Sequence, residues 1–333
     1  MNKFTFIDLF SGIGGFHIAA QRNGGKCLFA CEMDQYAKQA YFENYKIKPF
    51  GDIAQIDASG IPDHDLLCAG FPCQPFSIIG NRLGFDDMRG TLFYEIARIL
   101  QAKKPPMIVL ENVKQLSTHN KKQTLNSIIN ALQEIGYKVC WKVLNALDYG
   151  LPQKRERTII TGFMNHKAIF RWPDKTYQHK PLREILEEKV SSKYYASHAI
   201  QQKRKAKHQS KHPLSIWHEN KGGNVSSHPY SCALRAGASY NYLLVNGKRR
   251  LTPREMLRLQ GFPDDFRIIS SDSQTRKQVG NAVPVPMVEA VIKEVLYANS
   301  EVKRQQSQKR RRDLPFRRIP EKNNIRNRQV AYL

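Results

Sequence analysis

The opening segment, an apolar strand, a glycine-rich turn and a helix, constrains the fold more than any other feature. Residues 4–9 form a β-rich apolar run, residues 11–15 contain three glycines, and apolar residues at helical spacing begin at Phe16. A strand that passes directly into a helix is typical of a parallel sheet, because parallel neighbours need a crossover connection. The start of the chain therefore predicts an α/β fold.

The same alternation continues over the first half of the chain. Further strands are predicted at residues 26–30, 66–69, 107–110, 138–144 and 158–162. Helices are predicted between them at residues 35–44, 91–101 and 124–135. We expect a doubly wound, mostly parallel sheet with its ligand site at the carboxyl ends of the strands.

The positions at which the alternation of strands and helices ends and resumes predict four segments. Residues 1–164 form the α/β domain, and residues 165–275 form a smaller, irregular domain of loops and short strands. Residues 276–300 return to the first domain through an amphipathic helix. Residues 301–333 read as a disordered basic tail, because Lys, Arg, Gln, Ser and Asn predominate there.

Net charge narrows the class of partner. The 333 residues include 53 Lys and Arg against 29 Asp and Glu, a net charge of +24. Residues 301–333 hold eleven of these bases and three acids, a net of +8, so +16 remains in the rest of the chain. An excess of this size favours a polyanionic partner such as nucleic acid.

Composition argues against several other classes. With 41% hydrophobic residues the chain can bury a core, and we find no apolar run of the ~18 residues that cross a bilayer. Met1, Asn2 and Lys3 lead directly into the first strand, so we expect no signal peptide and a cytoplasmic location. The six cysteines include no CxxC pair, so we expect reduced thiols and no metal.

The glycine turn predicts a nucleoside ligand. Glycines between strand and helix let a ligand approach the backbone, and Glu32 follows the next strand, where a carboxylate can accept ribose hydroxyls. The spacing differs from the dinucleotide fingerprint, because His17 takes the place of its last glycine. A nucleoside without phosphates, such as S-adenosylmethionine, fits better. Alternatively, the glycines serve only to make a tight turn.

Three further segments place reactive side chains at the same edge of the predicted sheet. Cys73 lies between Pro72 and Pro75 directly after a strand, so its thiol lies in an extended loop, and residues 74–90 can act as a lid. Glu111 ends another strand, and the charged segment 153–157 follows a turn. Singly, such residues are most often structural or solvated. Their shared position indicates an active site.

Together these segments resemble the ordered motifs of the DNA (cytosine-5)-methyltransferase family. The resemblance extends over residues 4–298, is highly specific, and is closest to bacterial restriction-modification enzymes of the HhaI-like type. It implies an S-adenosylmethionine-dependent, Rossmann-like fold with a target-recognition domain. The motifs that carry it are residues 8–15, 70–77, 111–113, 153–157, 254–263 and 278–284.

The resemblance implies catalytic roles for four residues. Cytosine C5 is a poor nucleophile until a thiolate adds at C6, and Cys73 is the candidate for that addition. Glu111 would protonate or hydrogen bond ring N3, and Arg157, with Arg155 near it, would hold O2 of the base. The target base would be rotated out of the duplex, since C5 and C6 are inaccessible within the stack.

The resemblance also implies binding residues. Contacts to S-adenosylmethionine fall on Phe10, Gly12, Gly14, Glu32, Met33, Asp52, Ile53, Asn281 and Val283. Contacts to double-stranded DNA fall on Gln74, Ser77, Arg235 and Tyr240. We expect a monomer that protects a short GC-rich palindrome, with GGNNCC as a working hypothesis, against a cognate restriction endonuclease that it need not touch.

Three other functions remain as alternatives. An RNA cytosine-5 methyltransferase would use the same cysteine chemistry, although the irregular segment of residues 165–275 favours duplex DNA. A non-catalytic nucleic-acid-binding module would explain the charge but not the ordered motifs. A nicotinamide oxidoreductase would explain Glu32 but needs a phosphate-binding turn that this sequence lacks.

Overall fold

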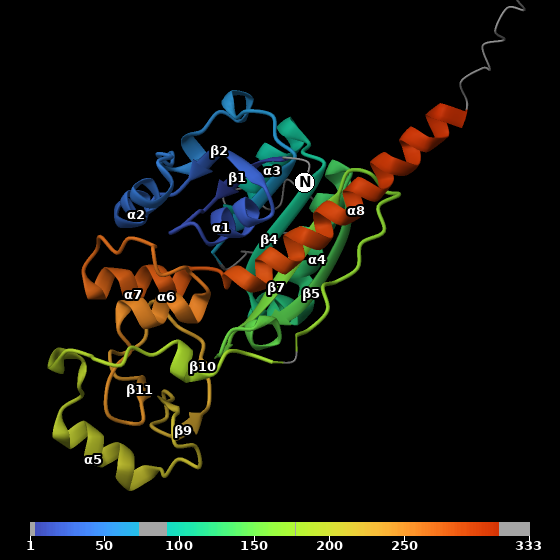
Figure 1. The fold of residues 1–333 in the computed structure, drawn as a ribbon. Helices are drawn as coiled ribbons and strands as arrows, with labels where there is room; N and C mark the ends of the chain where they lie inside the picture. Colours follow the sequence, from blue (N-terminus) through green and yellow to red (C-terminus); the bar gives the residue numbers. More distant parts are fainter. Residues whose placement is uncertain (1–3, 73–91, 177, 313–333) are drawn as a thin grey trace, which may run out of the picture.

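A computed structural model describes residues 4–72, 92–176 and 178–312. The side chains of residues 303 and 305–312 are not included. Within the described residues the central sheet has six strands in the order β2-β1-β3-β4-β7-β5 (Figure 1). The strands are β1 (Phe4–Leu9), β2 (Gly25–Cys31), β3 (Leu66–Gly70), β4 (Met107–Val113), β5 (Lys138–Asn145) and β7 (Glu156–Phe163). Each predicted strand is confirmed to within three residues at either end.

One strand of the sheet runs against the others. Strands β2, β1, β3 and β4 pair in parallel, whereas β7 pairs antiparallel with both β4 and β5. The beginning of β7 therefore lies at the edge where the parallel strands end. In this register Arg157 stands opposite Val113 and Ile159 stands opposite Glu111. The predicted mostly parallel, doubly wound sheet is confirmed, and the reversed strand adds its first residues to the ligand-binding edge.

Helices cover both faces of the sheet, as alternation along the strands requires. On one face Phe6, Cys68 and Val109 pack with the apolar sides of α1 and α8. On the other face Leu67 and Leu110 pack with α3 and α4. These helices, with α2, are α1 (Gly15–Arg22), α2 (Gln35–Tyr45), α3 (Leu92–Lys103), α4 (Gln123–Ile135) and α8 (Val285–Arg312).

Residues 164–284, between β7 and α8, contain little sheet and are here called the lower part. They lie below the central sheet in Figure 1. Its strands are β8 (Ile216–Glu219), β9 (Val225–His228), β10 (Ser231–Cys232) and β11 (Leu243–Val245). Its helices are α5 (His198–Lys207), α6 (Pro253–Gln260) and α7 (Asp272–Asn281). The expected short strands are present, whereas these helices were not predicted. Strand β10 pairs with β6 (Gln153–Lys154), which links this part to the segment before β7.

The expectation of a disordered tail from residue 301 is wrong for its first twelve residues. Helix α8 continues to Arg312, and Val302 is buried against the core of the sheet domain. Residues 301–312 are mainly good helix formers and contain no Gly or Pro to end a helix. Residues 313–333 lie outside the described part of the chain.

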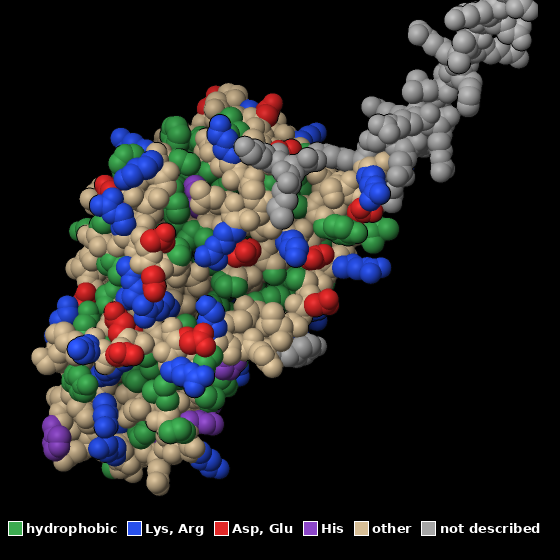
Figure 2. All heavy atoms as spheres, viewed as in Figure 1, with side chains coloured by type: hydrophobic (Ala, Val, Ile, Leu, Met, Phe, Trp, Pro, Cys, Tyr) green, Lys and Arg blue, Asp and Glu red, His purple; other side chains and the backbone are tan. Residues whose placement is uncertain are grey.

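Cationic side chains are scattered over the face that Figure 2 shows. Figure 2 shows Lys and Arg side chains spread over the sheet domain and the lower part alike, with acidic side chains between them. In the described part of the chain, no helix is long and apolar enough to cross a membrane. Cys27, Cys31, Cys68, Cys140 and Cys232 are all free thiols.

A buried ion pair anchors α6 to the rest of the lower part. Glu255 is fully buried, and its carboxylate accepts hydrogen bonds from both terminal nitrogens of Arg249 at 2.9 and 2.8 Å. The same carboxylate accepts the backbone N–H groups of Glu187 and Thr252. Thr252 also caps α6 in a capping box with Glu255. One carboxylate thus satisfies four donors.

Replacing Glu255 with Ala is expected to destabilise the fold by about 3–5 kcal/mol, because it leaves the buried Arg249 charge unpaired. Glu289→Gln, which breaks the half-exposed pair with Arg22, is the matched control and should change stability by about 1 kcal/mol or less. Urea unfolding followed by circular dichroism measures both. If both variants lost the same free energy of unfolding, burial of the Arg249–Glu255 pair would not add to its contribution to stability.

Candidate active site

A cavity of about 370 Å³ lies at the carboxyl edge of the sheet. This volume is within the range of small-molecule sites, about 300–1,000 Å³. Ten of the residues predicted for catalysis or cofactor binding line it: Phe10, Gly12, Glu32, Met33, Asp52, Ile53, Glu111, Arg155, Arg157 and Asn281. The structure therefore brings together side chains from the first and last motifs of the sequence.

The glycine turn forms one wall of this cavity. Phe10 and Gly12 both have positive φ angles, +54° and +53°, so the backbone turns sharply after β1. Glu32, just after β2, accepts the N–H of Gly12 at 2.8 Å with one carboxylate oxygen and that of Asp34 at 2.8 Å with the other. Glu32 thus holds the turn in place. It also lines the cavity, and each of its oxygens keeps a lone pair that could accept a hydrogen bond from a hydroxyl group of a ligand.

The same wall continues in the segment after α2, which lies beside Glu32 because the N–H of Glu32 donates to the Phe50 carbonyl oxygen at 3.0 Å. Asp52 accepts the N–H of Ala54 at 3.0 Å and begins a short helical turn in which Ile53 is buried. Arg98, from α3, donates to the carbonyl oxygens of Ile53 and Ile56 at 3.1 and 2.8 Å. Met33 lies at the mouth of the cavity and is 72% exposed. A flat apolar group could be enclosed between these side chains.

Two predicted cofactor residues lie behind the wall rather than on it. Gly14 begins α1 with a φ of +84°, and a Cβ there would meet the Tyr45 ring at 2.2 Å. Val283 is buried, and its side chain and backbone closely approach Gly15. Both residues shape the turn. Neither is among the residues that line the cavity.

A buried aromatic cluster supports the turn from behind, and the sequence analysis missed it. The Tyr45 hydroxyl donates to the carbonyl oxygens of Ile13 and Gly14 at 3.0 and 3.2 Å. The His17 ring stacks on Tyr45 and forms a 2.7 Å hydrogen bond with the Tyr41 hydroxyl. Burial lowers the pKa of His17 to about 4, so the ring is neutral near pH 7. The residue that replaces the third glycine is therefore part of the support for the turn.

Asp8 is the least expected member of this region. It is fully buried on β1, and burial, reinforced by the nearby charge of Glu32, raises its pKa well above the usual value for a carboxyl group. The neutral form is the one that such a site favours, because an isolated carboxylate is costly to bury.

At the other end of the cavity Glu111 and Arg157 form an ion pair. Arg157 Nε lies 2.8 Å from Glu111 Oε1, and both side chains are nearly buried. Arg157 also donates to the Glu156 carbonyl oxygen at 2.8 Å, which fixes its guanidinium. The pair arises because β7 runs against β4 and places Arg157 diagonally across from Glu111. A carboxyl group and a guanidinium therefore face the cavity side by side.

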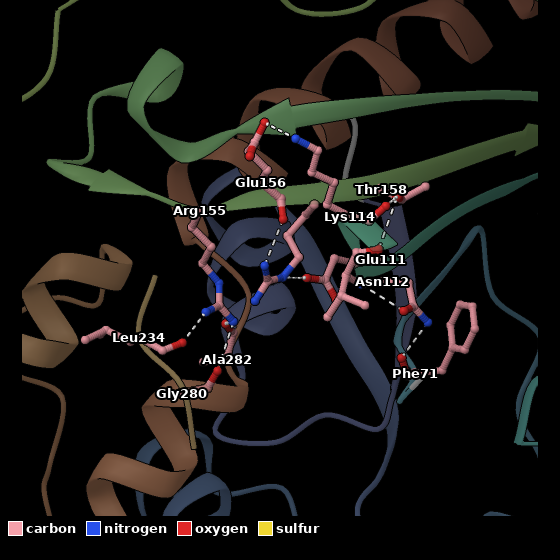
Figure 3. Close-up of polar contacts among 12 residues, drawn as sticks. Phe71, Glu111, Asn112, Lys114, Arg155, Glu156, Thr158, Leu234, Gly280 and Ala282 are labelled. Carbon is pink, nitrogen blue, oxygen red and sulfur yellow. Dashed lines mark hydrogen bonds and ion pairs between the residues drawn. The ribbon is translucent and has the colours of Figure 1, made fainter. Parts of the chain in front are cut away.

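Asn112 positions the chain next to this pair. Its side-chain amide donates to the Phe71 carbonyl oxygen at 2.9 Å, which ties the end of β4 to the segment after β3 (Figure 3). Phe71 and Pro72 line the cavity and immediately precede Cys73 in the sequence. Cys73, Gln74, Ser77 and the predicted lid of residues 74–90 lie outside the described residues.

Arg155 has a different environment from Arg157. It is 1% exposed, and its two terminal nitrogens donate to three backbone carbonyl oxygens, of Leu234, Gly280 and Ala282, at 2.8–3.0 Å (Figure 3). Burial, reinforced by the neighbouring Arg157, lowers the pKa of Arg155 to about 9. These contacts are those of a residue that holds backbone segments together. Its terminal nitrogens are already paired within the protein.

The two predicted DNA-contacting residues of the lower part lie on one exposed loop. The guanidinium of Arg235 lies 5.0 Å from the centre of the Tyr242 ring. Tyr240 is 49% exposed, and its ring has Arg276 at 4.3 Å and Arg250 at 5.5 Å. An exposed tyrosine ring with arginine side chains beside it suits nucleic acid, since it offers both donors and an aromatic face.

The chemistry available at this edge is therefore of two kinds. One end of the cavity presents carboxylates and an apolar turn to a nucleoside-like ligand, and the other presents a carboxyl group and a guanidinium to a polar ring. No group of three His, Cys, Asp or Glu side chains in the described part of the chain is arranged to hold a metal ion.

Comparison with known proteins agrees with this geometry. The family described as C-5 cytosine-specific DNA methylase matches residues 4–297. Type II methyltransferase M.NgoBI of Neisseria gonorrhoeae is 56% identical over 293 residues, which cover 87% of this chain and 92% of that protein. Type II methyltransferase M.HhaI of Haemophilus parahaemolyticus is 38% identical and covers 87% of this chain and 94% of that protein.

A solved structure shows the same fold. The crystal structure of a Spodoptera frugiperda DNMT2 mutant superposes with a TM-score of 0.70 at 21% identity and covers 88% of this chain and 99% of that one. The predicted S-adenosylmethionine-dependent methyltransferase fold is confirmed, and the nicotinamide oxidoreductase and the non-catalytic module are excluded. The chain belongs to the C-5 cytosine-specific DNA methylase family and is a DNA cytosine-5 methyltransferase.

Proposed function

We propose that this enzyme methylates one cytosine in a short duplex sequence by covalent catalysis through Cys73, as part of a restriction-modification system. The observation that carries the proposal is the single cavity that joins the Glu111–Arg157 pair to the wall formed by Glu32 and Asp52. Its relatives M.NgoBI and M.HhaI are type II methyltransferases. The enzyme acts as a monomer in the bacterial cytoplasm, and a cognate endonuclease cleaves the unmethylated sequence without needing to touch it.

Cys73 is the proposed nucleophile. Its thiolate adds to C6 of the cytosine, a C6–S bond forms, and the electron pair of the C5–C6 double bond becomes available at C5. That pair forms the bond between C5 and the incoming methyl group. Loss of the C5 proton then leaves the C5–H bonding pair to re-form the C5–C6 double bond, while the C6–S bond breaks and the thiolate leaves with its electron pair. Asn112 supports this step at a distance, because it holds the Phe71 carbonyl oxygen just before Pro72 and Cys73.

Glu111 and Arg157 bind the polar edge of the same ring. Addition of the thiolate drives negative charge toward N3 and O2 of the cytosine. Glu111 donates to N3 once its carboxyl group has taken up a proton from solvent, and Arg157 donates to O2, so both groups stabilise the negative charge that develops. Their 2.8 Å ion pair keeps them aligned before the base arrives. Arg155 has a positioning role, because three backbone carbonyl oxygens already occupy its terminal nitrogens.

The residues of the other wall fit the methyl donor of this family, S-adenosylmethionine, which supplies an electrophilic methyl group when bound. Glu32 is placed to accept hydrogen bonds from ribose hydroxyls, and Asp52 to accept one from the adenine amino group. Met33 and Ile53 are placed to cover the adenine ring. The backbone at Phe10 and Gly12 can approach the methionine part closely, since the turn carries few side chains there. Asn281 completes the pocket from α7.

Double-stranded DNA is the proposed substrate, and the loop with Arg235 and Tyr240 reads its sequence. Arginine can bind guanine through two hydrogen bonds in the major groove. Gln74 and Ser77 are the proposed contacts near the flipped base. Since C5 and C6 of cytosine are inaccessible in a stacked duplex, the base must be rotated out to reach Glu111 and Arg157.

Bisulfite sequencing of DNA from cells that express the chain tests this function. Protected cytosines are expected at one position of one short sequence. Cys73→Ala should abolish this protection, because the ring is then not activated, whereas Cys140→Ala, which removes a free thiol on β5, should retain it.

A trapped complex checks the nucleophile directly. Wild-type protein and the Cys140→Ala variant should form a denaturant-stable adduct with 5-fluorocytosine DNA and methyl donor, and Cys73→Ala should not. An adduct that persists in Cys73→Ala would refute the assignment. Methylation confined to RNA would instead favour the RNA cytosine-5 methyltransferase alternative.

Arg235→Ala is expected to relax the methylated sequence at one base pair. Loss of a bidentate contact to guanine removes about 1–3 kcal/mol of discrimination at that position. Bisulfite mapping on random-sequence duplexes measures the change. Lys203→Ala, which removes an exposed cation on α5, is the control and should leave the sequence preference unchanged. If Arg235→Ala instead weakens methylation of all sequences alike, Arg235 contacts phosphate.

A further inference from the structure

A single buried arginine joins two segments that have different tasks in the proposed function. Residues 234–242, here called the recognition loop, carry Arg235 and Tyr240. Residues 278–283, here called the donor wall, contain residues that line the cavity. Arg155 Nη1 donates to Leu234 O at 2.8 Å, and its Nη2 donates to Gly280 O and Ala282 O at 3.0 and 2.8 Å (Figure 3).

Two buried glutamines extend this connection. Gln153 Oε1 accepts the N–H of Leu234 at 3.0 Å, and its amide nitrogen donates to Gln260 Oε1 at 3.1 Å. Gln260 in turn donates to the carbonyl oxygens of Val279 and Ala282 at 2.8 and 3.0 Å. Both glutamines are fully buried. Gln153, Arg155 and Gln260 thus hold the start of the recognition loop and the donor wall in one hydrogen-bonded network.

The backbones of the two segments also touch directly. A Cβ placed on Gly280 would lie 2.3 Å from Ala236 N and 2.7 Å from Arg235 C. No side chain fits there unless one of the two backbones moves. The recognition loop therefore packs on the end of α7 without an intervening side chain.

Helix α7 holds the loop at a second point. Arg276 donates to Ala238 O at 2.5 Å and to Ser239 O at 3.2 Å, and its guanidinium lies 4.3 Å from the Tyr240 ring. The next residues of the helix, Lys277 and Gln278, line the cavity. The loop is thus fixed to α7 near its start and again at its middle, while none of its own residues lines the cavity.

We propose that Arg155 is a positioning residue that couples the seating of the recognition loop on DNA to the binding of the methyl donor. The identity of the two ligands rests on the proposed function. If the carbonyl oxygen of Leu234 moved away, Nη1 of the buried Arg155 would lose its hydrogen-bond acceptor, which costs free energy. The loop and the donor wall therefore move together, and by linkage each ligand must change the affinity for the other by the same factor.

Calorimetric titration tests this coupling. The affinity for S-adenosylhomocysteine is measured with and without a duplex that contains the methylated sequence. In the wild-type protein we expect the duplex to raise it about fivefold or more. Arg155→Lys should lower this ratio, because a single ammonium cannot reach carbonyl oxygens on both segments and only the glutamine and α7 contacts then remain.

Arg98→Lys is the matched control. Arg98 also holds carbonyl oxygens at the cavity, those of Ile53 and Ile56, but none of its hydrogen bonds in the described structure reaches the recognition loop. It should weaken S-adenosylhomocysteine binding equally with and without DNA, so the ratio stays at the wild-type value. A ratio unchanged in Arg155→Lys, or equal to one in the wild type, overturns the proposal.

Hydrogen exchange on the unaltered protein gives a second readout that needs no variant. S-adenosylhomocysteine alone, without DNA, should slow amide exchange several-fold in residues 235–242, although these residues do not line the cavity. If Arg155→Lys does not fold, unchanged exchange in this loop overturns the proposal. If S-adenosylhomocysteine does not bind the wild-type protein at all, the proposed function fails instead of the coupling.

Discussion

The antiparallel pairing of β7 with β4 is the constraint on which the site depends. In an all-parallel sheet the start of a strand lies at the edge away from the ligand. Because β7 is reversed, its first residues and the segment before it lie where β1, β3 and β4 end. This reversal places Arg157 beside Glu111 and brings Arg155 to the boundary with the lower part of the molecule. The two arginines are only two residues apart, yet Arg157 pairs with Glu111 whereas Arg155 binds backbone carbonyl oxygens of the lower part and of the segment after α7.

Buried polar groups hold the lower part to the sheet domain, and nearly all of them are paired. The amide groups of Gln153 and Gln260 and the terminal nitrogens of Arg155 each have partners, most of them backbone carbonyl oxygens. Satisfied networks of this kind specify one arrangement, because any shift leaves a buried donor without an acceptor. The cavity wall is therefore held by hydrogen bonds from a distance as well as by its own residues.

Local patterns predicted the sheet domain well. Strands such as β1 and β3 are short apolar runs bounded by turn residues. This pattern is typical of parallel strands that are buried on both faces. The side chains at strand ends, Glu32 and Glu111, could be assigned to one edge because the order of strands and helices determines where that edge lies.

What the sequence did not show has physical reasons. An apolar run reads the same in either direction, so the reversal of β7 left no local signal. The partners of Arg155 are backbone carbonyl oxygens 79 to 127 residues away, and any residue type has such an oxygen. By contrast, α6 did carry a signal: Thr252, Pro253 and Glu255 form a capping box with proline at the first turn. That signal was overlooked because the surrounding segment looked irregular.

A crystal structure of the protein with S-adenosylhomocysteine and a duplex that carries 5-fluorocytosine at the target position tests the central claim most directly. The claim is that one cavity at this edge of the sheet holds both the donor and the target base. The account predicts the nucleoside between Glu32 and Asp52 and the cytosine ring beside Glu111 and Arg157, bonded at C6 to Cys73. Electron density for either group outside this cavity, or a cytosine that remains stacked in the duplex, would contradict it.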